Sequence, residues 1–408
     1  MARKAKRDLT IEQQLARGPI DLPFLTLVIL LTGVGLIMLL SASYPSAFYD
    51  LDPNISTGGD PYYYFKRQLI FAAVGLAAMV ALSIMNYQWY RWMSVFVLGA
   101  AVVLMLLVFT PLGRSVDDAR RWIVLFGFRF QPSEVAKVGI IMFFAARLSK
   151  RKSQLKEPKK WSKRTVTGRI GAFLDRIGLL ELIPYGIALA LVLGIIALQK
   201  HMSCMVLITV AAASVLFAAG ISLGWFVAGG SAVVAAMYYI ITQTDYMAAR
   251  IESWKDPFSD PLGSGYQVIQ SQTAIGSGGL LGLGLGNGKQ KFLFLPEEHN
   301  DFIFAVVCEE LGFVGACVII LLFMLLVIRG YWLALHARDR FGTLLIVGIT
   351  TLLAAQVFLN IGVVTGVVPP TGISLPFFSY GGTALMVQLA EMGMILSVSR
   401  QIPAPKAG

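Results

Sequence analysis

Long runs of apolar residues recur along this chain, and their length constrains its fold more than any other feature. A helix of about 20 apolar residues spans the hydrocarbon core of a bilayer. Ten such runs lie near residues 22–43, 68–85, 94–111, 132–148, 182–199, 202–220, 222–242, 302–329, 342–367 and 380–398. The chain is therefore predicted to be an all-α polytopic membrane protein with about ten transmembrane helices.

Composition excludes the other broad classes of protein. Of the 408 residues, 56% are hydrophobic and only 14% are charged, whereas a soluble chain carries about 25% charged residues. A soluble globular enzyme, a disordered protein and a secreted disulfide scaffold are all excluded. The three cysteines, Cys204, Cys308 and Cys317, lie inside apolar runs and match no metal-ligand spacing.

The basic residues predict the orientation of the chain. The loop at 149–181 holds ten of them: Lys150, Arg151, Lys152, Lys156, Lys159, Lys160, Lys163, Arg164, Arg169 and Arg176. The positive-inside rule places this loop in the cytoplasm, and an even number of spans places both termini there as well. The prediction is a cytoplasmic tail at 1–21, one integral membrane domain at 22–399 and a second tail at 400–408. The net charge of +11 then reflects topology and attraction to anionic lipid rather than nucleic acid.

Two segments predicted to lie outside depart from this simple pattern. Segment 112–131 carries Arg114, Arg120, Arg121 and Arg129. These arginines either pair with the neighbouring aspartates, 117 and 118, or bind phosphate, which suits the guanidinium fork. Segment 243–301, before the eighth helix, is far longer than the other outer loops and rich in aromatic residues, so we expect ordered structure there.

A glycine run at 276–288 superficially resembles a nucleotide-binding loop. Such a loop needs a preceding strand and a following helix, whereas this run lies between membrane spans. We therefore predict a sharp turn or a re-entrant element at the membrane surface. The segment 367–382, which is rich in proline and glycine, cannot form a continuous helix. It is predicted to be a re-entrant or surface loop that lines the same cavity as Asp301.

Asp301 stands at the predicted outer mouth of the eighth helix. Two interpretations are open from the residues alone. Aspartate is a good N-cap, which satisfies the free N–H groups of a helix. Alternatively, a carboxylate at the mouth of a membrane cavity is partly desolvated, which raises its pKa toward the working range of a general base.

Polar and ionisable residues also occur inside the predicted spans, where they are costly and tend to mark function. They are Glu134, Lys137, Glu309, Glu310, Gln356, Asn360 and Glu391. Glu134 and Lys137 are three residues apart, so they share a helical face and can neutralise each other beside a polar cavity. For Gln356 and Asn360, an interhelical network that only fixes packing is the favoured interpretation.

Together these motifs resemble the SEDS family of cell-wall glycosyltransferases, which includes FtsW, RodA and SpoVE. The resemblance covers about residues 20–400. The matching segments are Arg120-Arg121-Trp122-Ile123, Gln131-Pro132-Ser133-Glu134 with Lys137, Asp256-Pro257, Gly265-Tyr266-Gln267, Gln270-Ser271, Ala274 to Gly279, Gly284-Leu285-Gly286, Leu295-Pro296-Glu297, His299, Asp301 to Phe304, Glu309 to Gly312 and Leu375 to Gly382. The basic inner loop and the segments 199–203 and 308–312 look more like the FtsW/SpoVE branch than like RodA.

The resemblance implies a function and roles for single residues. The family polymerises lipid II, an undecaprenyl-diphosphate disaccharide-pentapeptide, on the outer face of the cell membrane, and works with a class B penicillin-binding protein and other divisome proteins. It implies that Asp301 is the essential aspartate and that Glu134 and Lys137 line the central cavity. Arg120, Arg121, Gln131, Ser271 and His299 are predicted to bind substrate. Many relatives carry an acidic patch after the fifth span, but this chain has His201 to Cys204 there, so no acidic role is carried over to that position.

The hypothesis is a glycosyl transfer in which Asp301 deprotonates the acceptor hydroxyl and cations stabilise the departing diphosphate. A single carboxylate favours one displacement with inversion, by analogy with glycosidases. No cofactor is identified; a divalent cation could assist the diphosphate, but no ligand set is visible. The alternatives are a lipid II flippase, although no internal repeat is evident, and a non-catalytic scaffold for a penicillin-binding protein. The expected location is the cell membrane, at the division septum.

Overall fold

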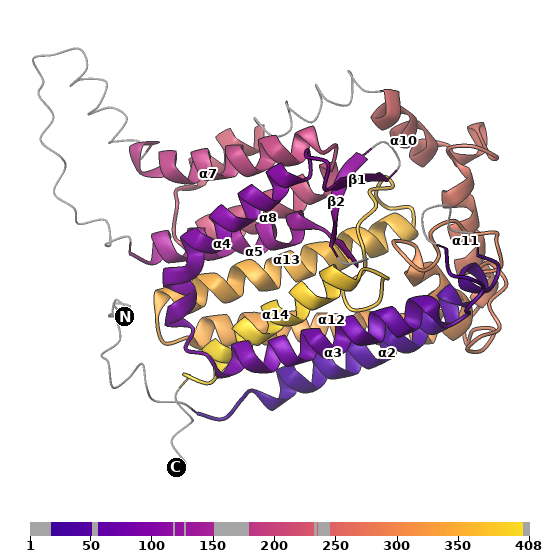
Figure 1. Cartoon of the computed structure of the whole chain (residues 1–408), viewed down its shortest axis with the longest axis horizontal. Helices are drawn as coiled ribbons and strands as arrows, with labels where there is room; N and C mark the ends of the chain where they lie inside the picture. The colour runs from indigo at the N-terminus through magenta and orange to yellow at the C-terminus, as the bar shows by residue number, and fades with distance from the viewer. Residues whose placement is uncertain are drawn as a thin grey trace, which may run out of the picture.

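The computed structural model describes residues 18–50, 56–116, 119–125, 128–150, 179–231, 235 and 245–402, and these residues are mostly helical (Figure 1). In chain order the elements are α2 (Leu22–Phe48), α3 (Tyr63–Ile84), α4 (Gln88–Leu107), β1 (Gly113–Val116), β2 (Ala119–Leu125), β3 (Phe128–Phe130), α5 (Pro132–Ser149), α7 (Leu179–Leu198), α8 (Met202–Ala218), α10 (Asp245–Lys255), the 3-10 helix η1 (Pro257–Ser259), α11 (Tyr266–Gly278), α12 (Ile303–His336), α13 (Arg340–Val364) and α14 (Gly382–Ser399). The predicted basic loop at 149–181 lies almost entirely outside the described residues.

Six helices of the described part are long and apolar enough to cross a membrane, namely α2, α3, α4, α12, α13 and α14. Shorter apolar stretches occupy Leu182–Leu198 and Met202–Ala218. The predicted multi-pass membrane protein is thus confirmed, while the count of about ten spans stays a prediction. The span near 222–242 lies largely outside the described residues, although residues 223–231 are helical.

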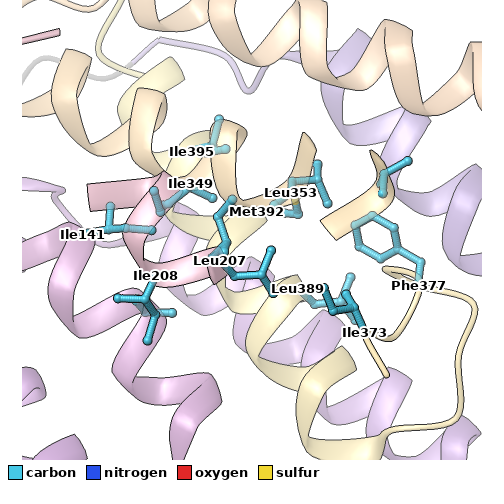
Figure 2. Close-up of a cluster of buried hydrophobic side chains, with 14 of the residues drawn as sticks. Ile141, Leu207, Ile208, Ile349, Leu353, Ile373, Phe377, Leu389, Met392 and Ile395 are labelled. Carbon is cyan, nitrogen blue, oxygen red and sulfur yellow. The ribbon is translucent and has the colours of Figure 1, made fainter. Parts of the chain in front are cut away.

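The core of the bundle lies where α5, α8, α13 and α14 meet, and Figure 2 shows their aliphatic side chains in contact. Nearly every residue of α5 is buried, which explains how this helix can carry charges that a lipid-facing helix could not. Small residues allow close approach between helices. A Cβ at Gly393 of α14 would lie 2.6 Å from the carbonyl oxygen of Met79 in α3, so this pair is packed backbone to backbone.

The two ends of the bundle differ in character. At one end the beginning of α2 lies near the end of α14: the Gly18 N–H donates to the carbonyl of Arg400, and Arg329 pairs with Asp21 at 2.5 Å. At the other end lie α10, α11, the strands and Asp301; we call it the loop end. The basic residues at 329, 338, 340 and 400 all belong to the first end, as the predicted orientation requires.

The all-α prediction missed a small sheet at the loop end. Strands β1, β2 and β3 pair in that order and antiparallel, with a register shift between Arg114 and Ser115. The segment 112–131 was expected to be an outer loop between two membrane spans. Its β-branched and aromatic residues favour strands instead, so the fold is mostly helical rather than all-α.

Helix α12 is broken at Gly312, whose φ of 69° and ψ of −173° are not helical. The part of the glycine run that follows α11, residues 279–284, packs against this break. Four backbone hydrogen bonds of 2.9–3.1 Å join them, with Leu283 N–H donating to Glu309 O, Gly284 N–H to Glu310 O, Phe313 N–H to Gly279 O and Val314 N–H to Leu280 O. The break therefore leaves no carbonyl of Glu309 or Glu310 unsatisfied, which is essential for irregular backbone at membrane depth.

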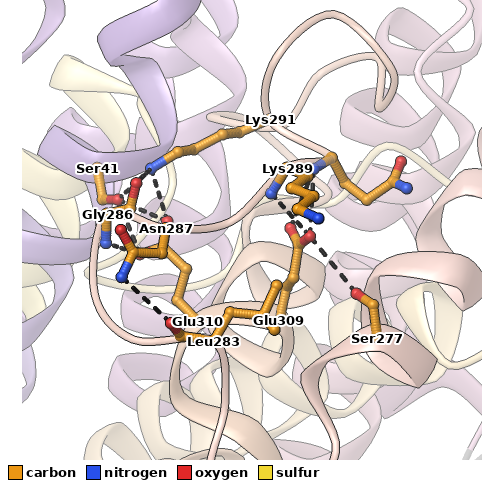
Figure 3. A network of polar contacts seen from close by, with 10 residues as sticks. Ser41, Ser277, Leu283, Gly286, Asn287, Lys289, Lys291, Glu309 and Glu310 are labelled. Carbon is orange, nitrogen blue, oxygen red and sulfur yellow. Dashed lines mark hydrogen bonds and ion pairs between the residues drawn. The ribbon is translucent and has the colours of Figure 1, made fainter.

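The side chains of Glu309 and Glu310 bind the end of the same run and the residues just after it (Figure 3). Glu309 accepts hydrogen bonds from the backbone of Lys289 at 2.8 Å and of Gln290 at 3.2 Å. Glu310 forms a buried ion pair with Lys291 at 2.7 Å, and Ser41 of α2 donates to the same carboxylate at 2.7 Å. The two glutamates therefore tie α2, α12 and the segment that leads to Asp301 into one unit.

We predict that Gly312→Ala destabilises the protein. This backbone conformation is essentially restricted to glycine, and alanine there costs about 1–3 kcal/mol. The added Cβ would also lie 2.2 Å from the Gly282 nitrogen, so the glycine run must move. The midpoint of thermal unfolding in detergent should fall. The control is Gly33→Ala in α2, where a Cβ meets nothing within 4 Å; equal midpoints for both variants would contradict the prediction.

Candidate active site

Asp301 lies two residues before α12 and is partly exposed at the loop end. The N-cap of α12 is Phe302, and no side chain caps this helix. The N-cap interpretation of Asp301 is therefore wrong, because the chain turns into the helix one residue later. The carboxylate is not used to start the helix and is available for chemistry.

The surroundings of Asp301 suit a group that exchanges protons near neutral pH. Burial raises the pKa of its carboxyl to about 7, and the negative charge of Glu297 adds to this shift. A hydrogen bond from the backbone N–H of Asp301 opposes this shift, as do the positive charge of Arg250 and the electrostatic interaction with His299. A carboxylate with a pKa near the working pH can both accept and release a proton, which is the property of a general base.

Glu134 and Lys137 form the ion pair that their spacing predicts. Lys137 Nζ lies 2.8 Å from Glu134 Oε2, and both side chains are buried, with 3% and 8% of their surface exposed. Cys204 of α8 and Glu391 of α14 lie close enough to interact electrostatically with Lys137. This polar cluster therefore lies inside the protein, between α5, α8 and α14, and not at a lipid-facing surface.

Two of the four arginines in segment 112–131, Arg120 and Arg121, were predicted to bind substrate, and they differ in their environment. Arg120 is exposed at the loop end. Arg121 donates to the backbone carbonyl of Lys200 at 2.6 Å and of Gln199 at 3.4 Å, so it holds β2 against the end of α7. The alternative pairing with the aspartates at 117 and 118 lies outside the described residues.

The other predicted substrate-binding residues make contacts within the protein. The Gln131 N–H donates to Thr383 Oγ1 at 3.4 Å. Ser271 is fully buried and donates to the carbonyl of Val364 at 2.8 Å, which ties α11 to α13. The buried ring of His299 lies 4.5 Å from that of Tyr64. A role of these residues in binding substrate stays a prediction.

One residue at this site was missed in the sequence, namely Arg250 of α10. Its Nη1 donates to the carbonyl of Pro370 at 3.0 Å, and its charge reaches Asp301. Arg250 lies in the segment 243–301, for which only ordered structure was predicted. Its position about 50 residues before Asp301 left no local signal.

The part of the chain that the structure describes holds no group of three or more His, Cys, Asp or Glu side chains that could bind a metal ion. A divalent cation is therefore not assigned any ligands here.

Comparison with known proteins identifies the family. The family model FTSW_RODA_SPOVE, described as a cell cycle protein, matches residues 22–403. The chain belongs to this family. A probable peptidoglycan glycosyltransferase FtsW from Geobacter metallireducens is 39% identical over 94% of this chain and 95% of its own length. Stage V sporulation protein E from Bacillus subtilis is 37% identical over 93% of this chain and 97% of its own length.

Solved structures of this family share the fold. One solved structure is described as "Structural coordination of polymerization and crosslinking by a peptidoglycan synthase complex". A chain of that structure is 28% identical to this one, with a TM-score of 0.70 over 93% of this chain and 98% of that chain. The rod shape determining protein RodA of Thermus thermophilus is 25% identical, with a TM-score of 0.64 over 95% of this chain and 98% of that chain.

The buried pair generates a prediction about stability. Lys137→Met or Glu134→Gln alone leaves one unpaired charge inside the protein, which costs about 3–5 kcal/mol. The double variant should be more stable than either single variant, because it carries neither charge of the pair. The check is a double-mutant cycle of unfolding midpoints in detergent, and strictly additive losses would contradict it.

Proposed function

We propose that the chain is a peptidoglycan glycosyltransferase that polymerises lipid II into glycan strands on the outer face of the cell membrane and releases undecaprenyl diphosphate. The observation that carries the proposal is the carboxyl of Asp301. It does not cap α12, it is partly exposed, and burial raises its pKa to about 7. The relatives named above as probable peptidoglycan glycosyltransferases support the same reaction.

The proposed topology places the loop end outside the cell and both termini inside. The four arginines at the opposite end of the bundle support this orientation through the positive-inside rule. Acidic residues on the loop between α2 and α3 support it as well, since Asp50 and Asp60 lie at the loop end. Lipid II would then offer its sugars to Asp301 at the water boundary, while its polyprenyl tail stays among the helices.

The proposed chemistry is a single displacement. The 4-hydroxyl of the acceptor N-acetylglucosamine attacks C1 of the donor N-acetylmuramic acid, and Asp301 takes the hydroxyl proton. The bond between C1 and the diphosphate oxygen breaks, and the electron pair leaves with the diphosphate. Arg120 is assigned to stabilise that charge because it is exposed, whereas Arg121 already binds two carbonyl groups and Lys137 pairs with Glu134.

The proposed partner is a class B penicillin-binding protein that crosslinks the new strands. The solved peptidoglycan synthase complex, which coordinates polymerization and crosslinking, supports such an assembly. The relatives named FtsW and stage V sporulation protein E support work at a division or spore septum, together with other divisome proteins.

We predict that Asp301→Asn abolishes strand synthesis. The amide cannot accept the hydroxyl proton, and loss of a general base lowers rates by about 10²-fold or more. The measurement uses purified protein with its cognate transpeptidase and fluorescent lipid II. Glu252→Gln is the matched control, because this exposed carboxylate on α10 lies in the same segment and should leave the rate unchanged.

Three outcomes of this assay would argue against the proposal. Strand synthesis at the normal rate by Asp301→Asn would remove the assigned base. Movement of lipid II between leaflets without any product would indicate a flippase. Absence of both activities in the wild-type complex would indicate a scaffold.

The pH dependence supplies a second prediction for the same residue. The base must be ionised, so the rate should rise with pH through about 7 and fall about tenfold per unit well below that value. Glu297→Gln removes a negative charge that raises the pKa of Asp301. The acid limb of the pH–rate profile should therefore move to lower pH in this variant, and an unmoved limb would contradict the electrostatic assignment.

A further inference from the structure

Asn360 of α13 makes two hydrogen bonds that both end at the candidate site. Its Nδ2 donates to the carbonyl of Asp301 at 2.7 Å and to the carbonyl of Ile373 at 2.7 Å. The side chain is almost fully buried, with 1% of its surface exposed. The orientation of the amide is forced, because the flipped form would place its oxygen against two carbonyl oxygens.

The segment that receives the second bond forms a wall beside the Asp301 carboxylate. A Cβ at Gly372 would lie 3.8 Å from Asp301 Oδ2, and Gly372 has a φ of +69°. Side chains of three elements fasten this wall by its carbonyls: Arg250 of α10 binds Pro370, Ser203 of α8 binds Thr371 and Asn360 of α13 binds Ile373. Asn360 also donates to the backbone carbonyl of Asp301.

These contacts distinguish Asn360 from a residue that only packs helices together. A packing amide bonds to the neighbouring helix, whereas both partners of Asn360 lie in irregular segments at the loop end. Those segments meet at the carboxylate, one of them carrying it and the other covering it. A single amide therefore fixes the gap between them.

We propose that Asn360 is a positioning residue for glycosyl transfer, which holds Asp301 at a fixed distance from the wall Pro370–Ile373 and keeps water away from the buried side of its carboxylate. This inference depends on the proposed function of Asp301 as the base. It assigns no substrate contact to Asn360, since the amide acts through the backbone of Asp301.

Loss of the two hydrogen bonds of Asn360 changes the pH dependence of the reaction, which a general loss of stability does not. When the two segments separate, water reaches the carboxylate and the penalty of burial falls, so the acid limb of the pH–rate profile moves to lower pH. The charged and titratable groups that face Asp301 are Glu297 and His299 on its own segment and Arg250 from α10. A change at Asn360 substitutes none of them. Arg250 is bound to Pro370 and would move away with the wall, which would raise the pKa of Asp301. Movement of the limb to lower pH therefore reports solvation of Asp301.

The experiment compares Asn360→Leu with Gln356→Leu in the purified complex with the cognate transpeptidase. Gln356 lies one turn earlier on α13 and is equally buried, at 2%, and its side chain does not bond to Asp301 or Ile373. Asn360→Leu should lower kcat at pH 8 at least about tenfold, leave the apparent KM for lipid II within about twofold, and move the acid limb to lower pH. Gln356→Leu should leave the limb in place.

Asn360→Ser is the second variant. The serine hydroxyl keeps one hydrogen-bond donor, and the smaller side chain fits into the same space. It should give an intermediate kcat and an intermediate limb. An acid limb identical to wild type in Asn360→Leu or in Asn360→Ser overturns the inference, as does the same movement of the limb in Gln356→Leu. Normal synthesis by Asp301→Asn would instead overturn the proposed function itself, so the two failures are distinguishable.

Discussion

Carbonyl groups of irregular backbone need donors from the protein wherever water is excluded, and this need governs the construction of the loop end. The break in α12 is closed by the glycine run after α11. Elsewhere the donors are side chains: Ser271 donates to the carbonyl of Val364 at the end of α13, Asn360 to that of Ile373 and Arg250 to that of Pro370. Arg121 and Ser271, which were predicted from the sequence to bind substrate, also bind backbone carbonyl groups at the loop end.

The sequence predicted the features that depend on neighbours along the chain. Apolar runs located the helices, and the spacing of three residues located the pair of Glu134 and Lys137. The strands at 113–130 were missed because short strands between arginines carry a weak signal. The contact of Asn360 with Asp301 was beyond prediction, since it joins residues 59 positions apart through a turn whose geometry no local pattern determines.

Two kinds of buried charge coexist in this molecule, and their difference is physical. Glu134 with Lys137, and Glu310 with Lys291, are closed pairs in which each ion neutralises the other, so little is gained by moving a proton. Asp301 has no such partner within a salt-bridge distance in the described structure, and its nearest charges oppose one another. A carboxyl left without a closed pair at a water boundary is the one whose protonation responds to its surroundings.

The break at Gly312 divides α12 into parts with separate duties. Residues 303–310 are all buried, whereas Phe313 and Val314, just after the break, are exposed. A continuous helix would require the part that follows Asp301 to share the register and tilt of the lipid-facing part. The break removes this requirement, because the first part is fixed by Glu309 and Glu310 to the glycine run rather than by its continuation. Asp301 is thereby held by the polar contacts of the loop end. The remainder of α12 can adopt the tilt that suits its contact with lipid.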